Sequence, residues 1–435
     1  MSRPYHVLRH RDFRLLWLSQ FVSLTGSQMQ TVALHWHVYL ITRSPLALGA
    51  LGLTRVLPIL AFSLFGGVTA DRYDRRRVMF ATQSVMLAGA AALAVATLSG
   101  RESLPLLYGA NALLAAATAF DNPARQALVP RLVPTAEIAS ALSMNLTMFQ
   151  AAMIGGPALA GLVIAGVGVP SAGLRALAGA GGSEDTTRLA LIYALNALSF
   201  VGVLVALVLM RTPGVVAAGG APEPPLSALR DGLRFVFRTP IMVWTTGLDF
   251  VATFFAGSLS LLPIIADQVL HSGPAGYGWL VAAPALGALA GSIYTSVRHL
   301  PARQGRLLLG AVAAYGVATV GYGLSRSYWL TFLALALSGL ADLVSTVIRQ
   351  TLRQLLTPDA LRGRMTSVNM IFFMGGPQLG ELEAGIVASL FASAAVGATV
   401  SVVSGGVATV LLAAGVAVAA PVVRDYVQPA APPRA

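Results

Sequence analysis

Long apolar segments recur along the whole chain, and short polar connections separate them. A helix rises about 1.5 Å per residue, so about 20 apolar residues cross the roughly 30 Å hydrocarbon core of a bilayer. Twelve segments meet this requirement, which predicts an all-α membrane protein with twelve transmembrane helices. The expected spans are 12–41, 46–70, 77–98, 104–125, 137–166, 189–210, 241–270, 274–296, 305–325, 329–350, 364–394 and 397–423.

A long polar connection lies between the sixth and seventh spans. Its first part is rich in Pro, Gly and Ala, and its second part, Leu226 to Phe237, alternates apolar residues with arginines. This pattern predicts a flexible linker that leads into a short amphipathic helix at the membrane surface. We therefore expect a six-helix bundle over residues 1–210, a linker over 211–240 and a second six-helix bundle over 241–435.

The two halves of the chain repeat one another at a constant offset of 224 residues. The repeated pairs are Gly67 and Gly291, Arg125 and Arg349, Pro134 and Pro358, Asn145 and Asn369, Gly156 and Gly380, and Gly161 and Gly385. Chance agreement at so many such positions is improbable, so the halves are pseudo-symmetric bundles related by duplication. Parallel repeats with a binding site between them near mid-membrane are an architecture of secondary transporters.

Composition and charge support a membrane protein and give its orientation. Of the 435 residues, 56% are hydrophobic and 11% are charged, whereas soluble domains carry about 25% charged residues. All 29 basic residues are Arg. If both termini are cytosolic, 23 arginines fall on the cytosolic side and five outside, with Arg55 left inside a span. Because cationic loops favour the cytosol, we expect this orientation, and we expect no nucleic-acid binding.

Several classes of chemistry lack the residues that they need. The chain has no Cys, and its six His show no ligand spacing with carboxylates, so we expect no metal site. No nucleophile and base are placed on one face as a membrane-bound enzyme would require. We therefore expect no catalytic residue and no cofactor, and a proton gradient would supply the energy.

The loop after the second span carries a recognisable motif from Gly67 to Arg77. It resembles the major facilitator signature Gly-x-x-x-Asp-Arg-x-Gly-Arg-[Arg/Lys], except that Asp74 stands where Gly is usual. The resemblance implies that Asp71 meets the N-terminus of the eleventh helix and latches the two halves in the outward-facing state. Gly67 would permit close helix approach. The alternative is a solvated basic turn that only sets orientation.

The basic residues of this latch would be Arg72, Arg75 and Arg76. Asp121 and Arg125, at the inner end of the fourth helix, are spaced i to i+4, which predicts a local salt bridge. We expect this pair to hold the loop near the Asp71 latch.

A narrower resemblance runs through most of the chain. The string Asp121-Asn122-Pro123-Ala124-Arg125-Gln126 is similar to the branch of enterobactin-type siderophore exporters and macrolide-efflux proteins, the transmembrane secretion effector family. That resemblance implies proton-driven efflux from a bacterial cell, with substrates that vary across the group. Members of this branch often carry Asp after the glycine of helix one, but here Ser27 follows Gly26. Coupling would therefore have to use another acid.

Four acids lie well inside the expected spans, namely Asp249, Asp342, Glu381 and Glu383. A charge in the bilayer costs about 2.5–3.5 kcal/mol on insertion scales, so such residues are candidates for proton coupling. We expect Asp249 to be the first of these. Asp342 shares a helix face with Arg349, which equally allows a structural charge network. Glu381 and Glu383 point about 200° apart, so only one can line a cavity; Glu381 is favoured.

Arg55 is a permanent cation near the middle of the second span. Such a charge indicates either an anionic substrate in the cavity or a pair with one of the four acids.

The fifth helix carries Gly155, Gly156, Pro157 and Gly161. A Gly-Pro step kinks a helix and lets a neighbour approach closely. The string is similar to the antiporter signature of major facilitator exporters, and a packing kink alone is the other interpretation.

We therefore predict a monomeric, multi-pass transporter of the bacterial cytoplasmic membrane. It would export a small molecule, such as a siderophore, a macrolide or another drug-like compound, by proton-coupled alternating access. An importer of the same fold and a transport-inactive scaffold or sensor remain the alternatives. The partners expected are the substrate and the lipid bilayer.

Overall fold

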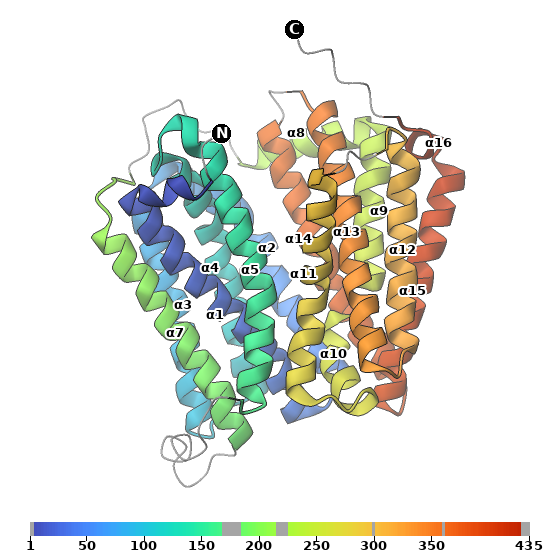
Figure 1. Ribbon diagram of the computed structural model, residues 1–435, viewed down its shortest axis with the longest axis horizontal. Coiled ribbons are helices and arrows are strands. Elements are labelled where there is room, and N and C mark those ends of the chain that lie inside the picture. Colours follow the sequence, from blue (N-terminus) through green and yellow to red (C-terminus); the bar gives the residue numbers. More distant parts are fainter. Residues whose placement is uncertain (1–3, 168–183, 215–224, 298–300, 359–361, 428–435) are drawn as a thin grey trace. The chain divides into compact units, whose positions relative to one another are not determined.

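The structure is a computed structural model that describes residues 4–167, 184–214, 225–297, 301–358 and 362–427. Twelve helices of 17 residues or more lie within these ranges (Figure 1). They are α1 (Arg11–Thr42), α2 (Pro45–Arg72), α3 (Arg75–Leu98), α4 (Leu104–Leu128), α5 (Ile138–Ile164), α7 (Glu184–Leu209), α9 (Pro240–Ala256), α11 (Gly273–Val297), α12 (Gln304–Leu324), α13 (Tyr328–Leu356), α14 (Arg362–Ser389) and α15 (Ala394–Ala419). Each expected span overlaps one of them.

Shorter helical segments join the long helices. They are η1 (Pro4–Arg9), η2 (Val129–Arg131), η3 (Thr135–Glu137), α8 (Pro225–Arg238), η5 (Leu259–Leu261), α10 (Leu262–Ile264), the π-helical turn η6 (Ile265–Val269) and α16 (Pro421–Arg424). Helix α8 lies where the short amphipathic helix was expected. The first part of the expected linker, 215–224, falls outside the described residues.

The seventh span differs from the prediction of one continuous helix over 241–270. Helix α9 ends at Ala256, and η5, α10 and η6 follow after a break at Gly257 and Ser258. Gly257 leaves the helical conformation, with φ −73° and ψ 46°. A Cβ at Gly257 would lie 3.2 Å from the Cα of Gly380, so the break allows α14 to approach closely. The apolar pattern did not show this break because the segment stays hydrophobic across it.

The folded chain divides into two compact units. Unit 1 comprises Met1–Arg43, Thr54–Pro225 and Gly273–Ala282, and unit 2 comprises Ser44–Leu53, Leu226–Ser272 and Ala283–Ala435. The first nine residues of α2 and the first ten residues of α11 are thus grouped differently from the bundles that the sequence suggested. The expected bundle boundaries stay a prediction.

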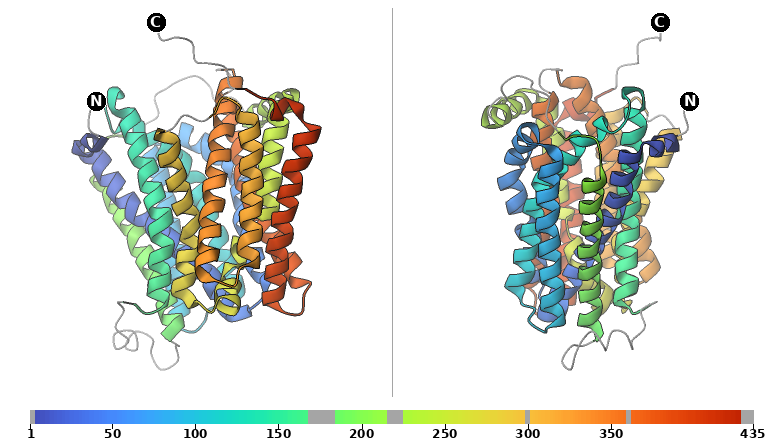
Figure 2. Two further views of the ribbon diagram at one scale, coloured as in Figure 1. Left: turned by 45° about the vertical axis from the view of Figure 1, so that its right-hand side comes forward. Right: turned by 90° about the vertical axis from the view of Figure 1, so that its left-hand side faces the viewer.

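The two units repeat one pattern of helix packing. In unit 1, α1 packs against α5 and α7, and α3 packs against α4 and α7. In unit 2, α9 packs against α14 and α15, and α12 packs against α13 and α15. Replacing α1, α3, α4, α5 and α7 by α9, α12, α13, α14 and α15 converts one packing arrangement into the other (Figures 1 and 2). This correspondence agrees with the duplication that the sequence repeat indicates.

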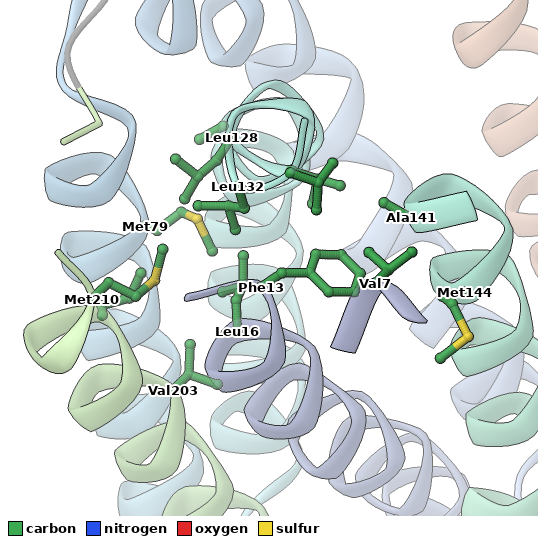
Figure 3. Packing of buried hydrophobic residues seen from close by; sticks show 14 of the residues in the cluster. Val7, Phe13, Leu16, Met79, Leu128, Leu132, Ala141, Met144, Val203 and Met210 are labelled. Atoms are coloured by element: carbon green, nitrogen blue, oxygen red, sulfur yellow. The ribbon is translucent and has the colours of Figure 1, made fainter. Parts of the chain in front are cut away.

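A hydrophobic core fills the end of unit 1 where α1 begins and α4 and α7 end. Figure 3 shows its side chains gathered around Phe13, which is 1% exposed. Val7 of η1, Leu128 of α4, Ala141 of α5 and Met210 beyond α7 belong to the same cluster. The core therefore fixes the helix ends that carry the charged motifs described below.

The outward surfaces of both units are apolar. Helix α7 exposes Leu198 and Val208 to 66% and 67%, and α15 exposes Leu411 and Val418 to 65% and 80%. Ten helical segments among the described residues are long and apolar enough to cross a membrane. Such contiguous apolar surface requires hydrocarbon around it, so the chain is a multi-pass membrane protein.

Candidate functional site

Three charged side chains meet in unit 2 and are named here the charge cluster: Asp249 of α9 with Asp342 and Arg349 of α13. One guanidinium nitrogen of Arg349, Nη1, forms an ion pair with Oδ1 of Asp249. The other, Nη2, lies 3.9 Å from Oδ1 of Asp342 and donates to Thr346 Oγ1 at 2.9 Å. Arg349 and Asp249 are 11% and 14% exposed, whereas Asp342 is 45% exposed.

The sequence suggested proton coupling by Asp249 and, separately, a charge network of Asp342 with Arg349, and the structure brings all three residues together. Asp342 and Arg349 do share a helix face, as their spacing of seven residues predicted. Asp249 is nevertheless the closer partner of Arg349, from a helix 100 residues earlier in the chain. A buried charge in a membrane is stable only with a partner, and Arg349 supplies it for both acids.

The formal charge of the cluster is −1, because two carboxylates face one guanidinium. Arg353, one turn further along α13, acts on Asp249 as an additional cation, so the four side chains together are formally neutral. Uptake of one proton by either carboxylate of the cluster would leave one neutral acid, and Arg349 would keep the other carboxylate as its partner. The arrangement can therefore exchange a proton without leaving Arg349 unpaired in the membrane.

Glu381 and Glu383 are both partly buried in α14. A Cβ at Gly52, in the Ser44–Leu53 segment of the same unit, would lie 2.8 Å from the Cβ of Glu381 and 3.1 Å from its Oε2. Gly380, on the same face as Glu383, packs against the backbone of Phe254 in α9. The proton-coupling roles of the two glutamates stay predictions.

Arg55 is partly buried in α2 of unit 1. Across the described ranges, no acid forms an ion pair with it. The four candidate acids, Asp249, Asp342, Glu381 and Glu383, belong to unit 2, so the expected pairing of Arg55 with one of them stays a prediction, as does its contact with substrate.

The motif loop binds helix ends within unit 1. Arg75 donates from Nη1 to Ala127 O at 3.0 Å, and Arg76 donates from Nη2 to Leu207 O at 2.5 Å. These carbonyls lie at the C-terminal ends of α4 and α7, where a cation also meets the negative end of the helix dipole. The two arginines therefore hold helix ends in place and do more than orient the loop.

Asp74, which stands where the signature usually has Gly, caps the start of α3. Its Oδ1 accepts from the backbone N–H groups of Arg76 at 2.9 Å and Arg77 at 3.2 Å, so it is the N-cap of α3. The signal for this cap in the sequence is an Asp directly before the first residue of a helix. Asp71 and Arg72 remain exposed, and the latch stays a prediction for them.

The close approach in this motif is made by Gly66 and not by Gly67. A Cβ at Gly66 would collide with the carbonyl oxygen of Ala119 in α4. One at Gly67 would meet no atom within 4 Å in the described part of the chain. Gly67, the glycine that matches the signature, is therefore not the glycine at the contact between α2 and α4.

Asp121 joins α4 to α3. It is 5% exposed, and its Oδ1 accepts from Thr82 Oγ1 and from Gln83 Nε2, both at 2.9 Å. The expected i to i+4 pair is present, with 3.8 Å between Oδ2 of Asp121 and Nε of Arg125. The closer partners on α3 could not be predicted because no local spacing connects them to Asp121.

The glycines of α5 have different neighbours. A Cβ at Gly156 would collide with Gln28 of α1, and one at Gly161 would lie 2.8 Å from the Cα of Gly278 in α11. Gly155 has no such neighbour among the described residues. A Cβ at Gly385, the repeat partner of Gly161, would lie 2.9 Å from the Cα of Gly49 in α2. Close packing thus explains the repeated glycines of α5 and α14, and Pro157 lies within an unbroken α5.

A buried polar seam joins α1 to α7. Asn196 donates to Gln30 Oε1 at 2.7 Å, and His37 Nδ1 lies 3.1 Å from the hydroxyl of Tyr193. A Cβ at Gly26 would lie 2.7 Å from Oδ1 of Asn196. The seam lies in the part of α1 that follows Gly26 and Ser27. Among the described residues no group of three His, Cys, Asp or Glu could hold a metal ion.

Comparison with known proteins gives the family. The model of the transmembrane secretion effector family matches residues 2–428. Enterobactin exporters EntS of Shigella boydii serotype 18 and Escherichia coli O81 are each 27% identical over 360 residues, which cover 82% of this chain and 81% of theirs.

Solved structures show the same fold. A bacterial homolog of the human lysosomal transporter Spinster, in an inward-facing and unoccupied conformation, has a TM-score of 0.75 at 18% identity and covers 99% of this chain and 100% of that one. The nucleoside transporter NupG has a TM-score of 0.67 at 13% identity, with 93% and 98% covered. The chain therefore belongs to the transmembrane secretion effector family of major facilitator transporters.

Proposed function

We propose that this transporter exports a small molecule across the bacterial cytoplasmic membrane in exchange for protons, and that the charge cluster carries the proton. The single observation that supports this most directly is the pairing of Asp249 and Asp342 with one arginine inside the membrane. Two carboxylates share one arginine as their ion-pair partner, so one of them can take up a proton while Arg349 stays paired with the other.

The proposed cycle uses the two acids of the cluster. A proton from outside neutralises Asp249, which releases Arg349 to pair with Asp342. Cargo leaves, and the proton passes inward when the cavity opens to the cytosol. The proton and the cargo each shift the equilibrium between the outward-facing and inward-facing states, because each binds one state more tightly than the other. Asp71 and Arg72 would latch the outward-facing state.

The enterobactin exporters among the relatives support efflux of a siderophore or a compound of similar size. Arg55 would then bind an anionic part of the cargo. The arginine distribution supports cytosolic termini. We propose that one chain forms the whole transport pathway.

Direction and coupling are tested together in everted membrane vesicles. On imposing a proton gradient, acid inside, vesicles with the wild-type chain should accumulate a siderophore or macrolide, and Asp249→Asn should abolish that accumulation. Asp425→Asn, which removes an acid that is 49% exposed at the end of α16, is the matched control and should leave it unchanged. Accumulation without a proton gradient, or uptake only in right-side-out vesicles, would contradict the proposal.

A further inference from the structure

A small pocket lies in unit 1, at the end where α1 begins and α4 ends. Its volume of about 20 Å³ is enough for one water molecule or for one small polar group. The residues that line it are Phe13, Leu16, Trp17, Gln20, Arg125, Val129, Asn145 and Met148. All belong to α1, α4, η2 and α5 of the same unit.

Two buried hydrogen-bond donors of this pocket have no acceptor. The amide nitrogen Nε2 of Gln20 and the guanidinium Nε of Arg125 each lack a hydrogen-bond partner among the described residues. Gln20 is 5% exposed. Asn145 also lines the pocket with a side-chain amide, and the indole N–H of Trp17 donates to Met144 O at 3.2 Å. A buried donor without an acceptor is unfavourable, so the two open donors point to a ligand that accepts hydrogen bonds.

Comparison of Arg125 with its repeat partner Arg349 indicates which kind of ligand fits the pocket. Arg125 and Arg349 occupy equivalent positions, and so do Asn122 and Thr346, which accept from the two guanidinium groups at 2.5 and 2.9 Å. Each arginine also has an acid of its own helix at 3.8 or 3.9 Å. The two environments match in these interactions.

The environments of Arg125 and Arg349 differ in the side chain that the first helix of each half supplies. In unit 2, α9 supplies the carboxylate of Asp249, which pairs with Arg349. In unit 1, α1 supplies the amide of Gln20, and the pocket lies beside Arg125. An added carboxylate would bring the net charge around Arg125 to −1, the same as in the charge cluster.

We propose that this pocket binds a carboxylate group, which accepts hydrogen bonds from Arg125 and from Gln20 as Asp249 pairs with Arg349 in unit 2. The carboxylate is that of a small anion or the end of a longer solute. Asp121 does not fill this role, because its Oδ1 accepts from Thr82 and Gln83 on α3, and its Oδ2 lies 3.8 Å from Nε of Arg125, beyond hydrogen-bond distance. The site does not depend on the direction of transport or on proton coupling.

Formate is the probe, because it is the smallest carboxylate. The purified full chain is titrated with sodium formate, and separately with sodium chloride at equal ionic strength. Binding is followed by the thermal unfolding midpoint and by line broadening of ¹³C-formate. Formate should raise the midpoint more than chloride does, because a ligand of the folded state stabilises it. Equal shifts by both salts would overturn the proposal, because the pocket would then hold only water.

Three variants locate the site. Arg125→Gln should weaken formate binding by at least about tenfold, because it removes a charge-assisted donor. Gln20→Glu should place a carboxylate beside Arg125, abolish the formate response and raise the unfolding midpoint without formate. Arg77→Gln removes an exposed charge outside the pocket and should bind formate like the wild type. If formate binds equally well to Gln20→Glu and to the wild type, the assignment is wrong, even should Arg125→Gln fail to fold.

Discussion

The replacement Asp249→Asn removes one of the two carboxylates that balance Arg349 in the membrane. The amide keeps the size of the side chain and loses its charge, so packing between α9 and α13 is preserved. Arg349 then retains Asp342 at 3.9 Å and Thr346 as partners. The variant therefore measures how strongly the buried pair stabilises unit 2.

The expected magnitude follows from distance and exposure. Two unit charges 3.9 Å apart attract by about 4 kcal/mol at an effective dielectric constant of about 20. Asp342 is 45% exposed, so screening should reduce its contribution below about 1 kcal/mol. Removing one member of a buried pair costs about 3–5 kcal/mol, and the remaining acid compensates part of it. We expect Asp249→Asn to lower the free energy of unfolding by about 2–3 kcal/mol.

The assay is a double-mutant cycle of Asp249→Asn with Arg349→Gln, measured by denaturant unfolding of the purified protein in detergent. Because each single variant already loses the whole Asp249–Arg349 interaction, the loss of stability in the double variant should be at least about 1 kcal/mol smaller than the sum of the single losses. Asp342→Asn is the matched comparison. If Asp249→Asn and Asp342→Asn cost the same, or if the cycle shows no coupling, the reasoning from burial and distance is refuted.

Three further replacements test individual contacts. Asp74→Ala should destabilise α3 by about 1 kcal/mol, because it removes the N-cap, and amide hydrogen exchange at the start of α3 should increase. Gly156→Ala should lower the unfolding midpoint because its Cβ collides with Gln28, whereas Gly155→Ala should not, and equal effects would contradict the assigned packing. Asp121→Leu should cost about 2–3 kcal/mol in denaturant unfolding, because it leaves Nε2 of Gln83 without its acceptor and Arg125 without its acid, whereas Thr82 still donates to Met79 O; a loss below about 0.5 kcal/mol would show that Gln83 and Arg125 find other partners.

The apolar pattern predicted the helices, because a bilayer requires about 20 apolar residues for every crossing. The offset of 224 residues predicted the duplication, and the matched helix packing of the two units agrees with it. The spacing of Asp342 and Arg349 also predicted one shared face. These features depend on local periodicity or on sequence identity, and both can be read from the chain itself.

Tertiary partners could not be predicted in this way. Nothing near Asp249 in sequence indicates Arg349, and nothing near Asp121 indicates Thr82, because these contacts depend on how helices pack. The break of the seventh span at Gly257 had a glycine as its signal, but a single glycine within an apolar run does not predict a break.

The central claim is that a proton moves through the charge cluster whenever cargo is exported. Proteoliposomes that contain a pH-sensitive dye and labelled cargo allow both fluxes to be measured in one sample. The wild type should move protons only when cargo is present, and Asp249→Asn should lose cargo-dependent proton movement while it still binds cargo. If Asp249→Asn transports cargo against its gradient with an unchanged proton flux, the charge cluster does not carry the proton.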